Sequence, residues 1–116
     1  MSRKWIGVDF DATLAEYHVE TGLPPPGKPI PKMVERVKKW LGEGKEVKIM
    51  TARMSPLNHA PDVLKEQTLL LERWCLKHLG RILPLTYMKD YLMVELWDDR
   101  AIQLIPNTGE RVDGKE

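Results

Sequence analysis

The sequence has a single cysteine, Cys75, among its 116 residues, so it cannot form a disulfide within the chain. Such scarcity is typical of proteins in a reducing compartment. The sequence also lacks any stretch near the ~20 consecutive apolar residues that a membrane-spanning helix needs. The apolar stretch near the N-terminus, Trp5 to Val8, is shorter than the about 7–15 residues of a signal-peptide core. We therefore expect a cytoplasmic protein that does not act in a membrane.

The sequence also has almost no net charge, because 18 Lys and Arg residues against 17 Asp and Glu residues leave +1. This balance does not demand a nucleic-acid or membrane partner. The three histidines are scattered and the cysteine is alone, so no Cys/His cluster offers the ligands that zinc prefers. The length fits one domain of the usual ~100–200 residues. We find no internal repeat and no linker, and expect one globular domain spanning residues 1–116.

Short apolar runs alternate with longer helical patterns, which predicts an α/β fold with a mainly parallel sheet. The expected helices cover residues 31–41 and 61–78, where apolar side chains recur at helical spacing. The expected strands number about five and cover residues 4–9, 46–51, 81–85, 91–97 and 101–105. These elements predict a single three-layer, Rossmann-like domain.

Two segments are expected to lack regular structure. Residues 15–31 include Pro24, Pro25 and Pro26, which fix φ and remove hydrogen-bond donors, so this segment should be a stiff surface loop. The polar tail that begins at about residue 106 should fray.

Polar side chains follow several of the expected strands, at the point where each strand ends. They are Asp9 and Asp11 after the first strand, Thr51 after the second, Lys89 between the third and fourth, and Asp98 and Asp99 after the fourth. Ligands of open α/β sheets bind beyond the carboxyl ends of the strands, where the strand order reverses. If the first strand is central, with the second and fourth beside it, these groups converge on one crevice.

Each of these residues alone has a structural explanation, such as a turn or a helix cap. The ordered set has no such explanation, because packing has no use for four carboxylates, a hydroxyl and an ammonium just past buried strands. Carboxylates brought this close repel one another. A divalent cation removes the repulsion, and Mg²⁺ prefers carboxylate, water and phosphate oxygens as ligands. The pattern therefore predicts a site for Mg²⁺ and a phosphate group.

The same residues carry a resemblance to the haloacid dehalogenase (HAD) superfamily. Residues 8–14, VDFDATL, resemble its first motif, a hydrophobic residue followed by Asp-x-Asp-x-Thr. Residues 49–51 resemble the second motif, Lys89 the third, and residues 96–99, LWDD, the fourth. The order and spacing of all four agree, over nearly the whole chain. One departure is Ala12, where the family often has Gly or Asn.

The resemblance implies a phosphatase and gives four side chains catalytic roles. Asp9 would attack phosphorus and form an aspartyl-phosphate. Asp11 would protonate the leaving oxygen and then take a proton from the hydrolytic water. Lys89 would neutralise charge on the nucleophile and the phosphoryl group, and Thr51 would bind a phosphate oxygen. The second aspartate of the first motif favours phosphatase over dehalogenase chemistry, because the dehalogenases of the family lack it.

The resemblance also implies a magnesium site. Asp9 and Asp98 would hold the ion together with the backbone carbonyl of Asp11. Asp99 would be a direct or a water-mediated ligand, and the sequence does not decide between the two.

The gaps between the motifs are too short for the cap domain that many HAD enzymes insert, so the chain resembles the capless type of phages and bacteria. We expect the loops at residues 17–30 and 53–59 to border an open site, covered by a bulky substrate or by a neighbouring subunit. A nucleotide, the phosphorylated end of a nucleic acid or another phosphomonoester would suit such a site. Arg53 would contact phosphate or stack on a base, although a solvated side chain is the default for arginine.

Two alternatives belong to other functional classes. A response-regulator receiver domain also combines acids, Thr and Lys on an α/β sheet. Its acidic pair comes early and its phosphorylated Asp later, whereas this chain has Asp-x-Asp first and Asp-Asp last. A non-catalytic, HAD-like phosphate- or metal-binding or scaffolding protein would usually lack a catalytic residue, and none is missing here.

Overall fold

Strand β1 (Trp5–Val8) lies inside a four-stranded, all-parallel sheet of order β3-β2-β1-β4. The computed structural model describes residues 3–116. β1 pairs on one side with β2 (Glu46–Met50) and on the other with β4 (Met93–Trp97). The prediction that the first strand lies between the second and the fourth is therefore confirmed.

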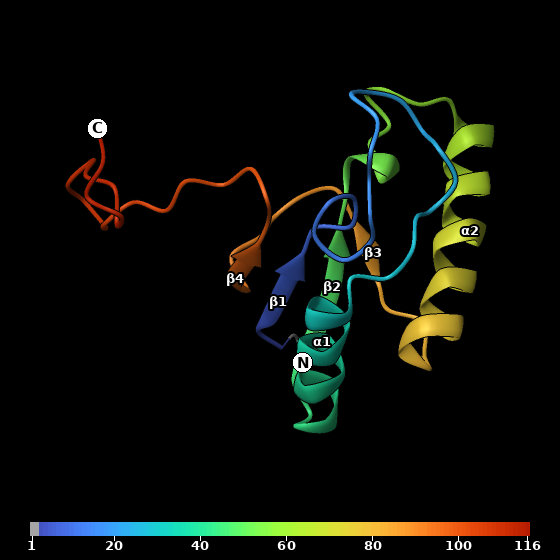
Figure 1. Ribbon diagram of the computed structural model, residues 1–116, viewed down its shortest axis with the longest axis horizontal. Coiled ribbons are helices and arrows are strands. Elements are labelled where there is room, and N and C mark those ends of the chain that lie inside the picture. The colour runs from blue at the N-terminus through green and yellow to red at the C-terminus, as the bar shows by residue number, and fades with distance from the viewer. Residues whose placement is uncertain (1–2) are drawn as a thin grey trace.

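Two α-helices connect the first three strands (Figure 1). Helix α1 (Pro31–Gly42) and helix α2 (Pro61–Leu79) each begin with proline at the first helical position, where its missing N–H is not needed. α2 ends at Gly80, whose φ of 82° is left-handed, and the Gly80 N–H donates to the Cys75 carbonyl. Both helices and the loop before α1 agree with the sequence expectation.

The hydrophobic core lies on one face of the sheet, between the strands and both helices. Alternate residues of β1 and β2 point into it, and Ile6 pairs with Val47 and Val8 with Ile49. The helices contribute side chains such as Val37 and Leu71 to the same cluster. Right-handed connections that run in one direction along a sheet place their helices on one face.

The expected third layer does not form within residues 3–116. Residues 87–92, which join β3 to β4, are too short for a helix that would cover the second face. The protein therefore has two layers.

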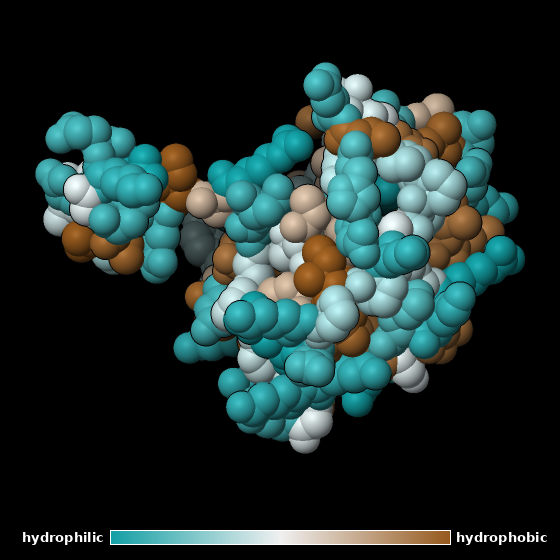
Figure 2. Space-filling view, viewed as in Figure 1, coloured by the Kyte–Doolittle hydropathy of each residue, from teal (hydrophilic) through white to brown (hydrophobic). Residues whose placement is uncertain are grey.

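Two strand predictions were wrong. The third strand, expected at residues 81–85, is the two-residue strand β3 (Leu85–Thr86), which pairs with the end of β2. Residues 101–105, the expected fifth strand, form no strand and contribute only an isolated bridge from Leu104 to Arg111. The tail after β4 projects away from the body of the molecule (Figures 1 and 2). A strand of the sheet needs a partner along its edge, and within residues 3–116 the tail pairs only with itself, through this bridge.

The strand order separates this fold from that of receiver domains. Receivers have the flavodoxin-like order 2-1-3-4-5, in which the third strand lies beside the first. Here β3 lies beside β2, and β4 takes the place beside β1. Within residues 3–116, neither helix has the length and apolar character needed to cross a membrane.

Candidate functional site

A cavity of about 650 Å³ opens at the carboxyl ends of β1, β2 and β4. Its walls come from the loop after β1, the 3₁₀ turn η1 (Ala52–Met54) with the residues that follow it, and the residues just after β4. Both loops expected to border the site, residues 17–30 and 53–59, contribute to the lining. The parallel sheet therefore gathers segments far apart in the sequence around one hollow.

Three carboxylates meet in this cavity. Asp9, Asp98 and Asp99 each present an oxygen, and these oxygens lie within 4.8 Å of one another. Burial raises the pKa of Asp9 from 3.8 to about 7, and its hydrogen bond with Asp99 and the negative charge of Asp98 add to the effect. Carboxylate oxygens crowded together in this way suit a hard cation such as Mg²⁺. This group can therefore hold a metal ion.

Thr13 connects two members of this group. Its hydroxyl lies 3.2 Å from Asp99 Oδ1 and 3.4 Å from Asp9 Oδ2, so its one proton can be donated to either oxygen. The same hydroxyl accepts a hydrogen bond from the Asp99 backbone N–H at 3.1 Å. The loop after β1 and the loop after β4 are thereby joined beside the carboxylates.

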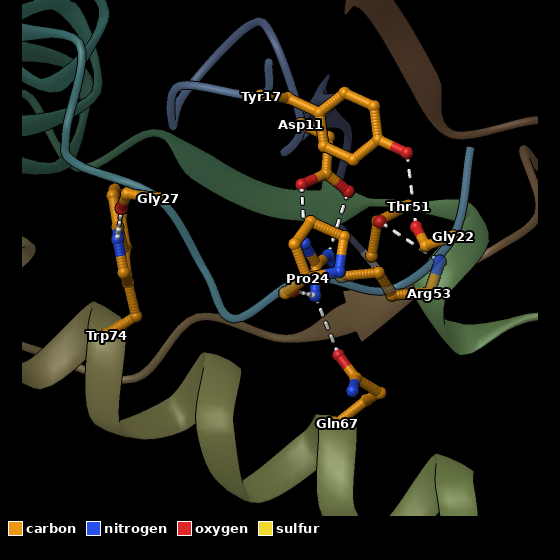
Figure 3. Close-up of polar contacts among 9 residues, drawn as sticks. All are labelled: Asp11, Tyr17, Gly22, Pro24, Gly27, Thr51, Arg53, Gln67 and Trp74. Atoms are coloured by element: carbon orange, nitrogen blue, oxygen red, sulfur yellow. Dashed lines mark hydrogen bonds and ion pairs between the residues drawn. The ribbon is translucent and has the colours of Figure 1, made fainter. Parts of the chain in front are cut away.

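Asp11 does not belong to the carboxylate group through its side chain, because that side chain pairs with Arg53. The Arg53 guanidinium donates from Nε to Asp11 Oδ2 and from Nη2 to Asp11 Oδ1, both at 2.8 Å (Figure 3). The Asp11 ligand expected for the metal is its backbone carbonyl, which this pairing leaves unused. The side chain therefore serves a different purpose from the three carboxylates beside it.

The default expectation of a solvated Arg53 was wrong. Its side chain is only 2% exposed. Besides Asp11, it donates from Nη1 to the Pro24 carbonyl at 2.8 Å and to Gln67 Oε1 at 2.9 Å. Of the five N–H groups of a guanidinium, four are thus used within the protein, and one on Nη2 remains. Arg53 joins the loop after β1, the proline-rich loop and α2.

Thr51 and Lys89, the other predicted phosphate ligands, are placed differently. Thr51 is buried at the end of β2 and lines the cavity, and its Oγ1 accepts a hydrogen bond from the backbone N–H of Arg53 at 3.2 Å. Lys89 is exposed, does not line the cavity and makes no hydrogen bond or ion pair within residues 3–116. Tyr87, from the same loop as Lys89, does line it. The structure brings Thr51 to the site, but it does not bring Lys89 there.

Several residues of the cavity had no predicted role. Tyr17 and Tyr87 give it two aromatic walls, and Arg100 extends its positive charge toward Asp99, with 3.9 Å between Nε and Oδ2. His59 also lines the cavity. Arg100 directly follows the predicted Asp99, and Tyr87 lies two positions before Lys89; that closeness in sequence was the signal for them.

Hydrogen bonds hold the proline-rich loop, residues 15–31, in place beside the cavity. The Trp74 indole N–H on α2 donates to the Gly27 carbonyl at 2.8 Å (Figure 3). The Glu16 N–H donates to the Lys28 carbonyl at 2.8 Å, and Tyr17 donates from its hydroxyl to the Gly22 carbonyl at 3.1 Å. Together with the Pro24–Arg53 bond, these contacts hold a fixed wall beside the carboxylates.

Comparison with known proteins supports the fold alone. No protein-family model matches the sequence, and no curated protein matches it. Among solved structures, the chain is similar to a conserved protein of Bacteroides thetaiotaomicron, with a TM-score of 0.56 and 21% identity. The similarity covers 91% of this chain and 84% of that one, so it extends over the parallel α/β domain as a whole.

Proposed function

We propose that this protein is a Mg²⁺-dependent phosphohydrolase of the HAD type, without a cap domain, and that Asp9 is its nucleophile. The observation that carries the proposal is the convergence of Asp9, Asp98 and Asp99 within 4.8 Å at the carboxyl ends of parallel strands. Asp11 lies beside them, held apart by its own cationic partner. A two-step phosphoryl transfer needs a set of carboxylates that holds a metal and supplies the nucleophile. It also needs a separate carboxyl that transfers protons.

The metal would be held by Asp9 and Asp98, with Asp99 as a direct or water-mediated ligand and the Asp11 carbonyl as a further one. Bound there, Mg²⁺ would offset the negative charge of the carboxylates and of the substrate phosphate. The raised pKa of Asp9 fits this role, because a bound cation would stabilise the charged form of a carboxyl crowded by two others.

In the first step, an Asp9 oxygen attacks phosphorus, and the bond from phosphorus to the leaving oxygen breaks. Asp11 gives its proton to that oxygen, and the alcohol leaves. In the second step, water attacks the aspartyl-phosphate and gives a proton to Asp11, which releases inorganic phosphate and restores Asp9. Thr51 donates its hydroxyl hydrogen to a phosphate oxygen. Lys89 lies outside the cavity, so it would supply positive charge to the phosphoryl group only if its loop, which also carries Tyr87, moves toward the bound substrate.

The substrate we propose is a nucleotide, the phosphorylated end of a nucleic acid or another phosphomonoester of similar size. A cavity of about 650 Å³ is larger than a phosphate group needs and is within the ~300–1,000 Å³ of typical ligand sites. Tyr17 and Tyr87 line it and offer flat apolar surfaces to a base. A neighbouring subunit that covers the open cavity would serve the same purpose as a bulky substrate.

The test is phosphate release from nucleotides, phosphorylated oligonucleotide ends and sugar phosphates, by wild type and Asp9→Asn, with Mg²⁺ and with EDTA. We expect release by wild type with Mg²⁺ and none by the variant or with EDTA. Release from sugar phosphates alone would contradict the nucleotide assignment. A folded protein that binds Mg²⁺ and releases phosphate from no substrate would favour the non-catalytic binding or scaffolding role.

A further inference from the structure

The pairing of Arg53 with Asp11 goes beyond the roles that the sequence assigned to either residue. The sequence predicted Arg53 as a substrate ligand, yet four of its N–H groups bind the protein and its side chain is 2% exposed. Two of the four go to the two oxygens of Asp11. An arginine fork that bonds both oxygens fixes the plane of the carboxylate as well as its position.

The other two bonds fix Arg53 itself. Nη1 is held between the Pro24 carbonyl and the Gln67 side chain, which is itself 4% exposed on α2. The guanidinium carbon also lies 5.6 Å from the centre of the Phe10 ring. Contacts from three sides leave this side chain little freedom, and it passes that constraint on to Asp11 (Figure 3).

Asp11 remains accessible from the cavity. Its side chain is 23% exposed and lines the cavity, and each oxygen has a second lone pair beyond the bond from Arg53. A proton donor works only when it points at the leaving oxygen, and a displacement of ~1 Å can reduce the rate about 10²-fold. In this chain the orientation of Asp11 comes from Arg53.

We propose that Arg53 is a positioning residue, which aims the Asp11 carboxyl at the leaving-group oxygen and does not bind the substrate phosphate. This role rests on the proposed phosphohydrolase activity, and it adds that the effect of Arg53 depends on the leaving group and on Asp11. Loss of the Arg53 fork should matter most for substrates whose leaving group needs a proton. It should matter little once Asp11 itself has been removed.

The experiment compares an alkyl phosphate, whose alkoxide is a poor leaving group, with an aryl phosphate, whose phenolate leaves without much help. The measured quantity is kcat/KM, because it reports the steps up to departure of the leaving group. For Arg53→Lys, which keeps the charge and loses the fork, we expect a loss of roughly 10–10²-fold on the alkyl phosphate. On the aryl phosphate we expect a loss of only a few-fold. Asp11→Asn should show the same selectivity with a larger loss, on the order of 10²–10⁴-fold.

A double variant separates positioning from direct binding. If Arg53 acts through Asp11, Asp11→Asn with Arg53→Lys should be no slower than Asp11→Asn alone. Equal losses on both substrates, multiplied together in the double variant, would overturn the proposal and assign Arg53 to the phosphate. Wild type that releases phosphate from neither substrate would overturn this proposal together with the phosphohydrolase itself.

Two further variants control for folding. Gln67→Leu removes one support of Arg53 from outside the cavity, and it should give a smaller loss with the same selectivity for the alkyl phosphate. This variant decides the question if Arg53→Lys does not fold. Arg36→Lys is the matched control, because Arg36 lies against the Trp97 ring, does not line the cavity and should tolerate the change with unaltered kcat/KM.

Discussion

Thr13 and Asp99 are 86 positions apart in the sequence, and the side chain of the first holds the second in place. The Thr13 hydroxyl accepts the Asp99 backbone N–H at 3.1 Å and lies 3.2 Å from Asp99 Oδ1. It also lies 3.4 Å from Asp9 Oδ2. One buried hydroxyl thus fixes the spacing of two carboxylates that would otherwise repel each other.

Thr13→Val should therefore weaken Mg²⁺ binding. Valine has the same shape but cannot bond Asp99, and loss of a residue that orients metal ligands typically reduces affinity about 10–100-fold. Titration of Mg²⁺ by calorimetry measures the effect. Thr68→Val is the matched control, because that hydroxyl bonds only within α2 and to Met54 Sδ. Equal Mg²⁺ affinity of wild type and a folded Thr13→Val would contradict the role given to Thr13.

The metal-free protein should lose stability as the pH rises toward neutrality. The pKa of Asp9 is about 7 in the folded protein against an ordinary 3.8, so folding favours the protonated form. This contribution is full below pH ~3.8 and is lost as the pH rises through about 7. In EDTA, the Tm advantage of Asp9→Asn over wild type should grow between pH 4 and pH 8. Parallel Tm curves for the two proteins would contradict the raised pKa.

Saturating Mg²⁺ should reverse this difference. The ion favours the charged form of Asp9, and a ligand that binds only the folded state raises its stability. Wild type should then gain more in Tm from Mg²⁺ than Asp9→Asn does, most clearly near pH 8.

The proline-rich loop should not tolerate a side chain at Gly27. A Cβ there would lie 2.0 Å from the Glu16 carbonyl oxygen, so the backbone must shift. Overpacking of this kind costs about 1–3 kcal/mol, and chemical denaturation of Gly27→Ala should show a loss of that order. Gly42→Ala is the control, since a Cβ at Gly42 meets nothing within 4 Å. A Gly27→Ala protein as stable as Gly42→Ala would show that the loop is not packed as described.

Lys89→Ala tests a role that comes from the resemblance. If Lys89 reaches the phosphoryl group when substrate binds, its removal should lower kcat by about 10²–10³-fold, the effect typical of a lost donor to developing charge. Lys65→Ala, an exposed lysine on α2, should have no effect. An unchanged kcat for Lys89→Ala would leave Arg100, which lines the cavity, as the candidate for that charge.

The sequence predicted the elements that local pattern decides. Pro31 and Pro61 begin the two helices and Gly80 ends the second, because proline and glycine fix the backbone locally. The convergence of Asp9 with Asp98 was also predictable, since the carboxyl ends of neighbouring parallel strands share one edge of the sheet.

The remaining features depend on three-dimensional packing. Residues 101–105 have the composition of a strand, but among residues 3–116 no strand pairs with them, so composition alone gave a wrong prediction. The partner of Arg53 could not be read from spacing, because Asp11, Pro24 and Gln67 come from three separate segments. Lys89 was assigned from its position in the third motif, and that position does not determine whether its loop places the side chain in the cavity.

The aspartyl-phosphate intermediate is the most direct test of the account. Wild type turning over a substrate with Mg²⁺ is quenched in acid, and mass spectrometry of its peptides locates any phosphoryl group. We expect it on Asp9 and absent with Asp9→Asn. With an aryl phosphate, whose leaving group needs no proton, we expect a larger amount with Asp11→Asn, because only hydrolysis of the intermediate then slows. Phosphate release by wild type with no phosphorylated Asp9 peptide, and continued release by Asp9→Asn, would contradict the account.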